Sequence, residues 1–189
     1  LPVPASRLIG AADPLGEMLA GLQLRSATVY SLGVEPPGDY LRQFGLEVDV
    51  AAAAQELGAI ILFDDDFGWT LPRIAEVYNL LRKCPELPLI VPNPDQVFPH
   101  EGELMPTSGS IARWLQGLCR LHDLHIDPIY LGKPYPPMYR RAEALLKGMD
   151  GSLKAGQIAM IGDSLFSDMA GAQRAGWLTG WMQTGMPVE

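Results

Sequence analysis

The residues Ile158-Ala159-Met160-Ile161-Gly162-Asp163, continued by Ser164-Leu165-Phe166-Ser167-Asp168, decide the fold class of this chain. Four apolar residues that run into a glycine and an aspartate are typical of a buried strand with a carboxylate at its carboxyl end. Ligands of open α/β sheets bind at this edge. Asp168 follows at the start of a helix expected over Met169 to Ala175. Two carboxylates there form a hard oxygen site that suits Mg²⁺.

A lysine occupies a comparable place upstream. Lys133 stands in Gly132-Lys133-Pro134, directly after an apolar strand expected over Ile126 to Leu131. An ammonium group at a strand end supplies a fixed positive charge for a phosphate. The sequence therefore predicts a phosphate-binding lysine close to the carboxylates.

The remainder of the chain alternates strand and helix patterns. Period-two and continuous apolar runs predict strands, and apolar residues at helical spacing predict helices. The strands are expected at 27–32, 47–50, 58–63, 89–91, 126–131, 158–161 and 179–182, and the helices at 39–44, 71–83, 111–120, 137–147 and 169–175. This βα alternation predicts an α/β fold with parallel sheets.

Taken together, these residues resemble motifs three and four of the haloacid dehalogenase (HAD) superfamily of phosphohydrolases. The pattern Gly-Lys-Pro, followed some 30 residues later by Gly-Asp-x4-Asp, is matched by Lys133, Asp163 and Asp168. The resemblance is closest to the capped sugar-phosphate and pyridoxal-phosphate phosphatase (NagD-like) branch. It continues through Asn93-Pro94-Asp95 and Ser108-Gly109-Ser110-Ile111, so it covers most of the chain.

The resemblance implies a Mg²⁺-dependent phosphomonoester hydrolase that works through an aspartyl-phosphate. Asp163 would hold the Mg²⁺, Asp168 would be a second acid at the metal that orients its waters or Lys133, and Lys133 would offset the anionic phosphate. The family's nucleophile lies on an amino-terminal strand ending in Asp-x-Asp, which aligns upstream of Leu1. The chain is therefore expected to be a carboxyl-terminal piece that is inactive alone.

The same resemblance implies a division of the chain. Residues 1–24 would be a core segment preceding the cap, residues 25–123 an inserted α/β cap, and residues 124–189 the carboxyl-terminal part of an incomplete Rossmann-like core. In this branch a cap loop selects the substrate, which would be a small phosphorylated metabolite. Asn93, Asp95 and Phe98 would face it, although Asn93-Pro94-Asp95 also suits a simple turn. Capped relatives are often homodimers through the cap.

A second Asp-x-Asp offers an alternative nucleophile loop. The apolar run 60–63 leads into Asp64-Asp65-Asp66, with Gly68 and Thr70 nearby. Some 60 residues of α/β pattern precede it, however, and the nucleophile interpretation leaves them unexplained. We therefore expect these acids to belong to the cap.

Composition limits the remaining function classes. The 189 residues carry a formal charge of −8 and are 48% hydrophobic, so a packed core is expected and a nucleic-acid partner is disfavoured. No apolar run approaches the ~20 residues of a membrane span. Cys84 and Cys119 fit no metal or redox spacing and are interpreted as buried thiols of a cytoplasmic protein. His122 and His125 have no third zinc ligand in the sequence and are interpreted as solvated residues.

Two functions from other classes remain open. Gly162-Asp163-Ser164-Leu165 spells the signature of GDSL-type serine esterases, but no histidine follows His125 to act as the base. The other is a non-catalytic HAD-like protein that binds phosphate or metal.

Overall fold

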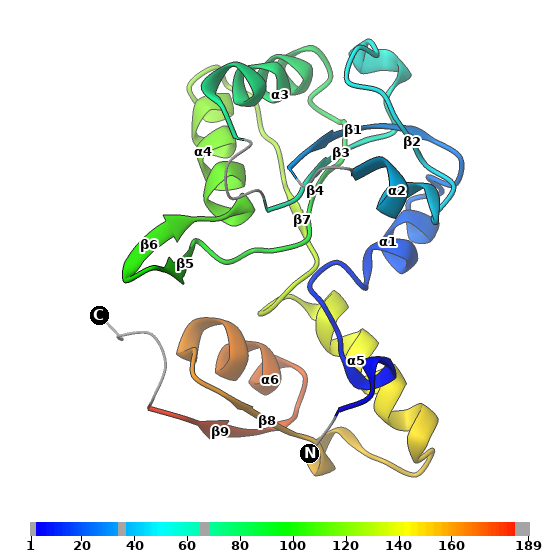
Figure 1. Ribbon diagram of the computed structural model, residues 1–189, viewed down its shortest axis with the longest axis vertical. Helices are drawn as coiled ribbons and strands as arrows, with labels where there is room; N and C mark the ends of the chain where they lie inside the picture. The colour runs from blue at the N-terminus through cyan, green and yellow to red at the C-terminus, as the bar shows by residue number, and fades with distance from the viewer. Residues whose placement is uncertain (1–2, 34–36, 65–68, 184–189) are drawn as a thin grey trace. The chain divides into compact units, whose positions relative to one another are not determined.

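The computed structural model describes residues 3–33, 37–64 and 69–183 (Figure 1). The chain forms two compact units, one of Leu15–Tyr130 and one of Leu1–Pro14 with Leu131–Glu189. The units divide after Pro14 and after Tyr130; the divisions expected from the sequence, after Leu24 and Asp123, stay a prediction.

The larger unit is built on a five-stranded sheet with the order β2-β1-β3-β4-β7, in which every neighbouring pair is parallel. The expected parallel sheet is confirmed. Its strands are β1 (Thr28–Leu32), β2 (Glu47–Val48), β3 (Ala59–Leu62), β4 (Leu89–Val91) and β7 (Ile129–Tyr130). The helices of this unit are α1 (Leu15–Gly21), α2 (Pro37–Arg42), α3 (Leu71–Lys83) and α4 (Ser108–Arg120), with one 3₁₀ turn, η2 (Ala54–Glu56).

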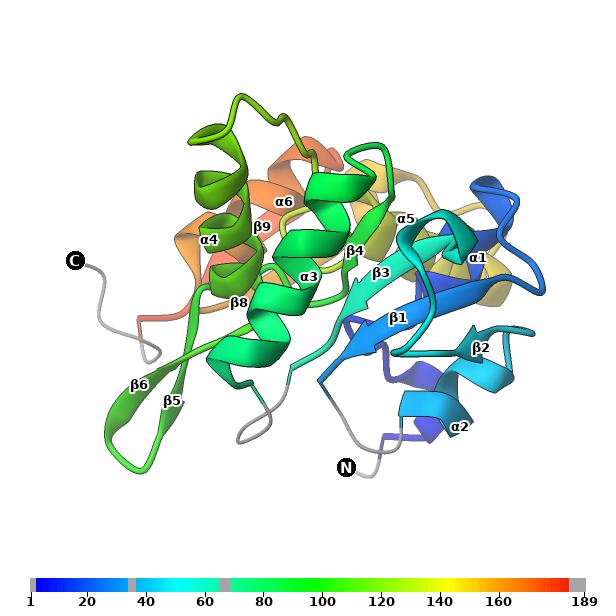
Figure 2. The same ribbon diagram turned by 90° about the horizontal axis from the view of Figure 1, so that it is seen from above.

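Helices cover both faces of this sheet, which explains why its strands read as continuous apolar runs. All four residues of β3 are buried. One face packs on α3 and α4, with side chains such as Ile60, Val77 and Leu115 in a single cluster. Helices α1 and α2 lie on the opposite side (Figures 1 and 2). Such double cover leaves the strand ends as the open edge, and polar residues follow β3 and β4 there.

A short antiparallel hairpin interrupts the βα pattern between β4 and α4. It consists of β5 (Val97–His100) and β6 (Glu103–Pro106), turned at Glu101 and Gly102, both of which have positive φ. Phe98, which the sequence predicts to lie in a cap loop, lies on β5 instead, so the loop prediction is wrong from Val97 onward. Pro99 and Pro106 conceal the strands because proline is depleted in sheets outside edge strands such as these.

The smaller unit contains two parallel strands and the helices that cover one of their faces. Tyr139, Ile158, Ala172 and Trp177 form the buried cluster. Its elements are η1 (Ala5–Arg7), α5 (Pro136–Met149), η3 (Ala155–Gln157), β8 (Ala159–Gly162), the π-helix η4 (Leu165–Met169), α6 (Ala170–Arg174) and β9 (Leu178–Trp181).

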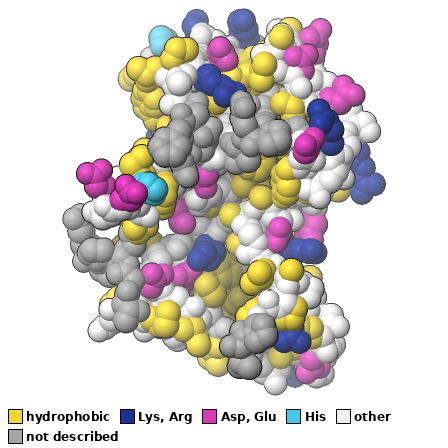
Figure 3. All heavy atoms as spheres, viewed as in Figure 1, with side chains coloured by type: hydrophobic (Ala, Val, Ile, Leu, Met, Phe, Trp, Pro, Cys, Tyr) yellow, Lys and Arg dark blue, Asp and Glu magenta, His cyan; other side chains and the backbone are white. Residues whose placement is uncertain are grey.

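The other face of the β8–β9 sheet is exposed. Ile161 is 66% exposed and Leu178 58%, although both lie on parallel strands, which are normally buried on both faces. Figure 3 shows hydrophobic side chains at the surface over this pair of strands. Among the described residues, β8 has β9 as its only strand neighbour. One face of this sheet and the outer edge of β8 are therefore left uncovered by the described residues.

Candidate functional site

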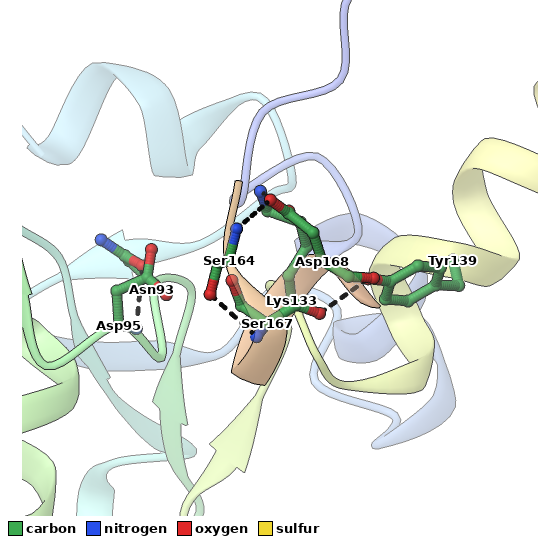
Figure 4. Close-up of polar contacts among 7 residues, drawn as sticks. All are labelled: Asn93, Asp95, Lys133, Tyr139, Ser164, Ser167 and Asp168. Atoms are coloured by element: carbon green, nitrogen blue, oxygen red, sulfur yellow. Dashed lines mark hydrogen bonds and ion pairs between the residues drawn. The ribbon is translucent and has the colours of Figure 1, made fainter. Parts of the chain in front are cut away.

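The structure brings Lys133 and Asp168 together in the smaller unit. Lys133 Nζ forms an ion pair and hydrogen bond with Asp168 Oδ1 (Figure 4). The Asp168 side chain is 3% exposed and that of Lys133 is 35% exposed, so the carboxylate is buried and the lysine side chain is partly open to solvent. A buried carboxylate is stable only when paired, and Lys133 supplies that pairing.

The π-helix η4 turns Asp168 back toward the end of β8. Its carboxylate Oδ2 accepts a hydrogen bond of 3.2 Å from the Ser164 N–H. A Cβ at position 162 would lie 2.2 Å from Asp168 Oδ2 and 2.5 Å from its Cγ, which no side chain tolerates. Gly162 is therefore required so that Asp168 can lie against the strand end. This contact is the physical reason for the glycine in the Gly-Asp-x4-Asp spacing.

Asp163 follows β8 directly and is half-buried. Its backbone carbonyl accepts a hydrogen bond of 3.0 Å from Trp181 Nε1, which fixes the main chain at the strand end. Within residues 3–33, 37–64 and 69–183, the Asp163 carboxylate has no hydrogen-bond or ion-pair partner. It is thus a carboxylate without a partner among the described residues, at the carboxyl end of a parallel strand.

Ser164 acts as a cap. Its Oγ accepts a hydrogen bond of 3.1 Å from the Ser167 N–H at the start of η4. This contact gives the hydroxyl a structural role next to Asp163. It accounts for Ser164 without the esterase chemistry that the Gly-Asp-Ser-Leu signature suggests.

Tyr139 is a residue of this site that the sequence analysis does not single out. Its hydroxyl lies 3.0 Å from the carbonyl of Ser167 and 3.1 Å from that of Asp168, and its single O–H is shared between these two acceptors (Figure 4). Its ring packs against Gly171 and edge-on against Trp177. Burial, together with the charge of Asp168, raises the pKa of Tyr139 to about 12. The small residue at 171 is the one sequence signal for this contact.

A second polar cluster lies in the larger unit, at the carboxyl ends of β3 and β4. Asp64 follows β3, and its Oδ2 accepts a hydrogen bond of 2.7 Å from Asn93 Nδ2. Its Oδ1 accepts from both N and Oγ of Ser108, each at 2.8 Å. Asp65 and Asp66, the other acids of the alternative nucleophile loop, lie outside the described residues.

The three residues expected to face a substrate also lie in this unit. Asn93 is half-buried, and its Oδ1 accepts a hydrogen bond of 3.1 Å from the N–H of the exposed Asp95. This is the turn geometry that the sequence allows. Phe98 lies on β5 rather than in the loop, half-buried, with its ring 6.0 Å from that of His100.

The described residues contain no cluster of three or more His, Cys, Asp or Glu that would hold a metal ion by itself. Across the same residues, none of the helices has both the length and the apolar character required to cross a membrane.

Comparison with known proteins agrees with the motifs. Residues 130–187 match the HAD-hydrolase-like family model. No curated protein sequence matches the chain. Among solved structures, a p-nitrophenyl phosphatase from Archaeoglobus fulgidus aligns over 95% of this chain with a TM-score of 0.73 and 23% identity. A possible sugar phosphatase of the HAD superfamily from Cytophaga hutchinsonii aligns over 97% with a TM-score of 0.80 and 26% identity.

A glycerol phosphate phosphatase from Mycobacterium tuberculosis, solved in complex with calcium, aligns over 98% of the chain with a TM-score of 0.76 and 23% identity. The chain spans 62%, 64% and 50% of the length of these three proteins, respectively. The resemblance read from the sequence is thus confirmed: residues 130–187 match the HAD-like hydrolases, and the chain has the fold of that superfamily's p-nitrophenyl phosphatases and sugar phosphatases over nearly its whole length.

Proposed function

We propose that this chain is part of a Mg²⁺-dependent phosphatase that hydrolyses a small phosphorylated metabolite. The observation that carries the proposal is the Lys133–Asp168 ion pair, in which Asp168 also accepts a hydrogen bond from the Ser164 N–H, directly after Asp163 at the carboxyl end of β8. Phosphoryl transfer depends mainly on positioning and on neutralising charge, and this arrangement offers both.

Lys133 and Asp168 have complementary tasks in this proposal. The Lys133 side chain is partly exposed, and its ammonium would bind a phosphate oxygen as a point charge. Asp168 holds that ammonium in place, and its second oxygen is held by the Ser164 N–H. Because both oxygens of Asp168 are engaged, we assign it the role of orienting Lys133 rather than that of a direct metal ligand.

The donor set fits Mg²⁺ in part. In phosphoryl-transfer sites Mg²⁺ takes one or two carboxylates, with substrate phosphate oxygens and waters as its other ligands. Asp163 would supply one such carboxylate from this chain. When bound, the ion would neutralise negative charge on the phosphoryl group.

The nucleophile would come from a segment outside these 189 residues. Two features support this proposal: the exposed face and open edge of the β8–β9 sheet, and the greater length of the three phosphatases of like fold. A strand added beside β8 would bring an aspartate to the same edge as Asp163. In this proposal the smaller unit is the incomplete core and the larger unit is the cap.

The similar structures and the larger unit support the proposed substrate class. The similar structures include a p-nitrophenyl phosphatase, a possible sugar phosphatase and a glycerol phosphate phosphatase. We propose that Asn93, Asp95 and Phe98 contact the non-phosphate part of a related ester.

A pair of lysine variants tests the proposal. The coding sequence upstream of Leu1 is expected to contain a strand ending in Asp-x-Asp, and the longer polypeptide is expected to hydrolyse phosphate esters with Mg²⁺. In it, Lys133→Gln should lower kcat at least about 100-fold, since it removes a charge that stabilises the transition state. Lys147→Gln is the matched control, because Lys147 pairs with Glu143 on the surface of α5. Equal activity of the two variants would overturn the proposal.

A further inference from the structure

Three segments that are distant in sequence meet at Asp64. One is the end of β3, which carries Asp64 itself. The second is the turn after β4 that begins at Asn93, and the third is the first residue of α4, Ser108. The Asp64 carboxylate accepts hydrogen bonds from Asn93 Nδ2 at 2.7 Å and from Ser108 N and Oγ at 2.8 Å. A single carboxylate thus ties the turn to the helix.

These contacts occupy most of the hydrogen-bonding capacity of Asp64. A carboxylate offers about four lone-pair sites, and three donors already point at this one. The charge is also well placed, because a negative group at a helix N-terminus is stabilised by the unpaired N–H groups there. A carboxylate whose lone pairs already accept three hydrogen bonds is a poor nucleophile, but it can act as a clamp that holds the turn against the helix.

The turn rests directly on the first turn of α4. A Cβ at Gly109 would lie 2.2 Å from the carbonyl oxygen of Asp95 and 2.3 Å from that of Pro94, so only glycine fits. Thr107 Oγ1 donates to the same Asp95 carbonyl. The backbone of Asp95 is therefore fixed from two sides, by the helix and by Asn93 Oδ1.

We propose that Asp64 is a positioning residue that sets the place of the Asn93–Phe98 segment. Its carboxylate fixes the Asn93 amide, Asn93 fixes Asp95 through the turn, and β5 follows from there with Phe98. That this segment selects a substrate rests on the proposed function; that Asp64 holds it in place does not.

An exchange of the two side chains tests the clamp. In Asp64→Asn, an amide N–H₂ faces either the Asn93 amide N–H₂ or the Ser108 N–H, so one contact is lost. In the double variant Asp64→Asn/Asn93→Asp, the donor and acceptor change places, and the Ser108 N–H still meets an acceptor. We expect amide hydrogen exchange at Ser108 and Asp95 to be about tenfold faster in the single variant. The double variant should return to within about threefold of the parent chain.

The measurement is made by ¹⁵N NMR on the 189-residue chain without substrate, so the clamp and the phosphatase proposal fail independently. Asp49→Asn is the matched control, since Asp49 caps the Ala51 N–H on the surface of the same unit. If Asp64→Asn does not fold, Asn93→Ala provides the same test and should shift the resonances of residues 94–98 while the Ser108 amide stays protected. Unchanged resonances at 93–98 in Asp64→Asn, or a folded double variant without recovery, would overturn the proposal.

Discussion

Replacement of Gly171 by alanine tests whether the contact between Tyr139 and Gly171 stabilises the smaller unit. Gly171 lies in α6, where alanine by itself should stabilise the helix by about 1 kcal/mol. The new Cβ, however, would lie 2.3 Å from both Cε2 and the hydroxyl oxygen of Tyr139. The ring cannot retreat without losing its bonds to the Ser167 and Asp168 carbonyls and its contact with Trp177.

The expected net effect is a loss of stability. Overpacking costs about 1–3 kcal/mol, and each hydrogen bond given up costs about 0.5–1.5 kcal/mol. Against the helix gain, Gly171→Ala should lower the free energy of unfolding of the smaller unit by about 1–3 kcal/mol. Urea unfolding followed by tryptophan fluorescence measures this through Trp177.

Gly148→Ala is the matched control. Gly148 also lies in a helix, α5, but a Cβ there meets no atom within 4 Å. This variant should stabilise the chain by about 0.5–1 kcal/mol through helix propensity alone. If Gly171→Ala were as stable as Gly148→Ala, the packing of Tyr139 on α6 would be wrong.

Three other predictions concern chemistry. The 189-residue chain should not hydrolyse p-nitrophenyl phosphate with Mg²⁺; turnover that is abolished by Asp64→Asn would instead identify Asp64 as the nucleophile. In the longer polypeptide, Asp163→Asn should weaken Mg²⁺ activation at least about tenfold. Ser164→Ala should change kcat by less than about threefold, because Ser164 Oγ caps η4. A larger loss of activity in Ser164→Ala than in Asp163→Asn would restore the esterase hypothesis. Burial raises the pKa of both Tyr30 and Tyr139 from 10.0 to about 12. Their contribution to stability is therefore complete below pH 10 and is lost as the pH rises toward 12. An ultraviolet titration in which all six tyrosines ionise together near pH 10 would contradict this prediction.

The sequence predicts the buried elements well because local pattern and burial agree there. Helix α3 spans Leu71–Lys83 as expected, and β3 lies within the expected range 58–63. The short helix α1 was not expected, since seven residues give only a weak periodic signal. The expected strand at 126–131 is reduced to Ile129–Tyr130, because Pro128 lacks the N–H that ladder pairing requires.

The sequence predicted residues of the candidate site only where the residues in contact belong to a recognisable motif. The sequence placed Lys133 and Asp168 in one site, and the structure pairs their side chains; their roles toward a metal or phosphate stay a prediction. Tyr139 was missed because its partners are backbone carbonyls, which leave no mark on the sequence. The Asp64 clamp was missed for a related reason: it joins positions 64, 93 and 108, and no local pattern encodes such distant pairings.

The hydrogen bond from the Trp181 indole to the Asp163 carbonyl gives the site a built-in optical probe. Trp181 is 41% exposed, so its emission depends on solvent as well as on this bond. If an ion binds the Asp163 carboxylate as proposed, it would act on the same peptide group and should change the surroundings of the indole. A difference spectrum between the parent chain and Trp181→Phe removes the signal of the other three tryptophans. The Trp181 fluorescence would then report the proposed ion binding at Asp163 without a label, a substrate or turnover.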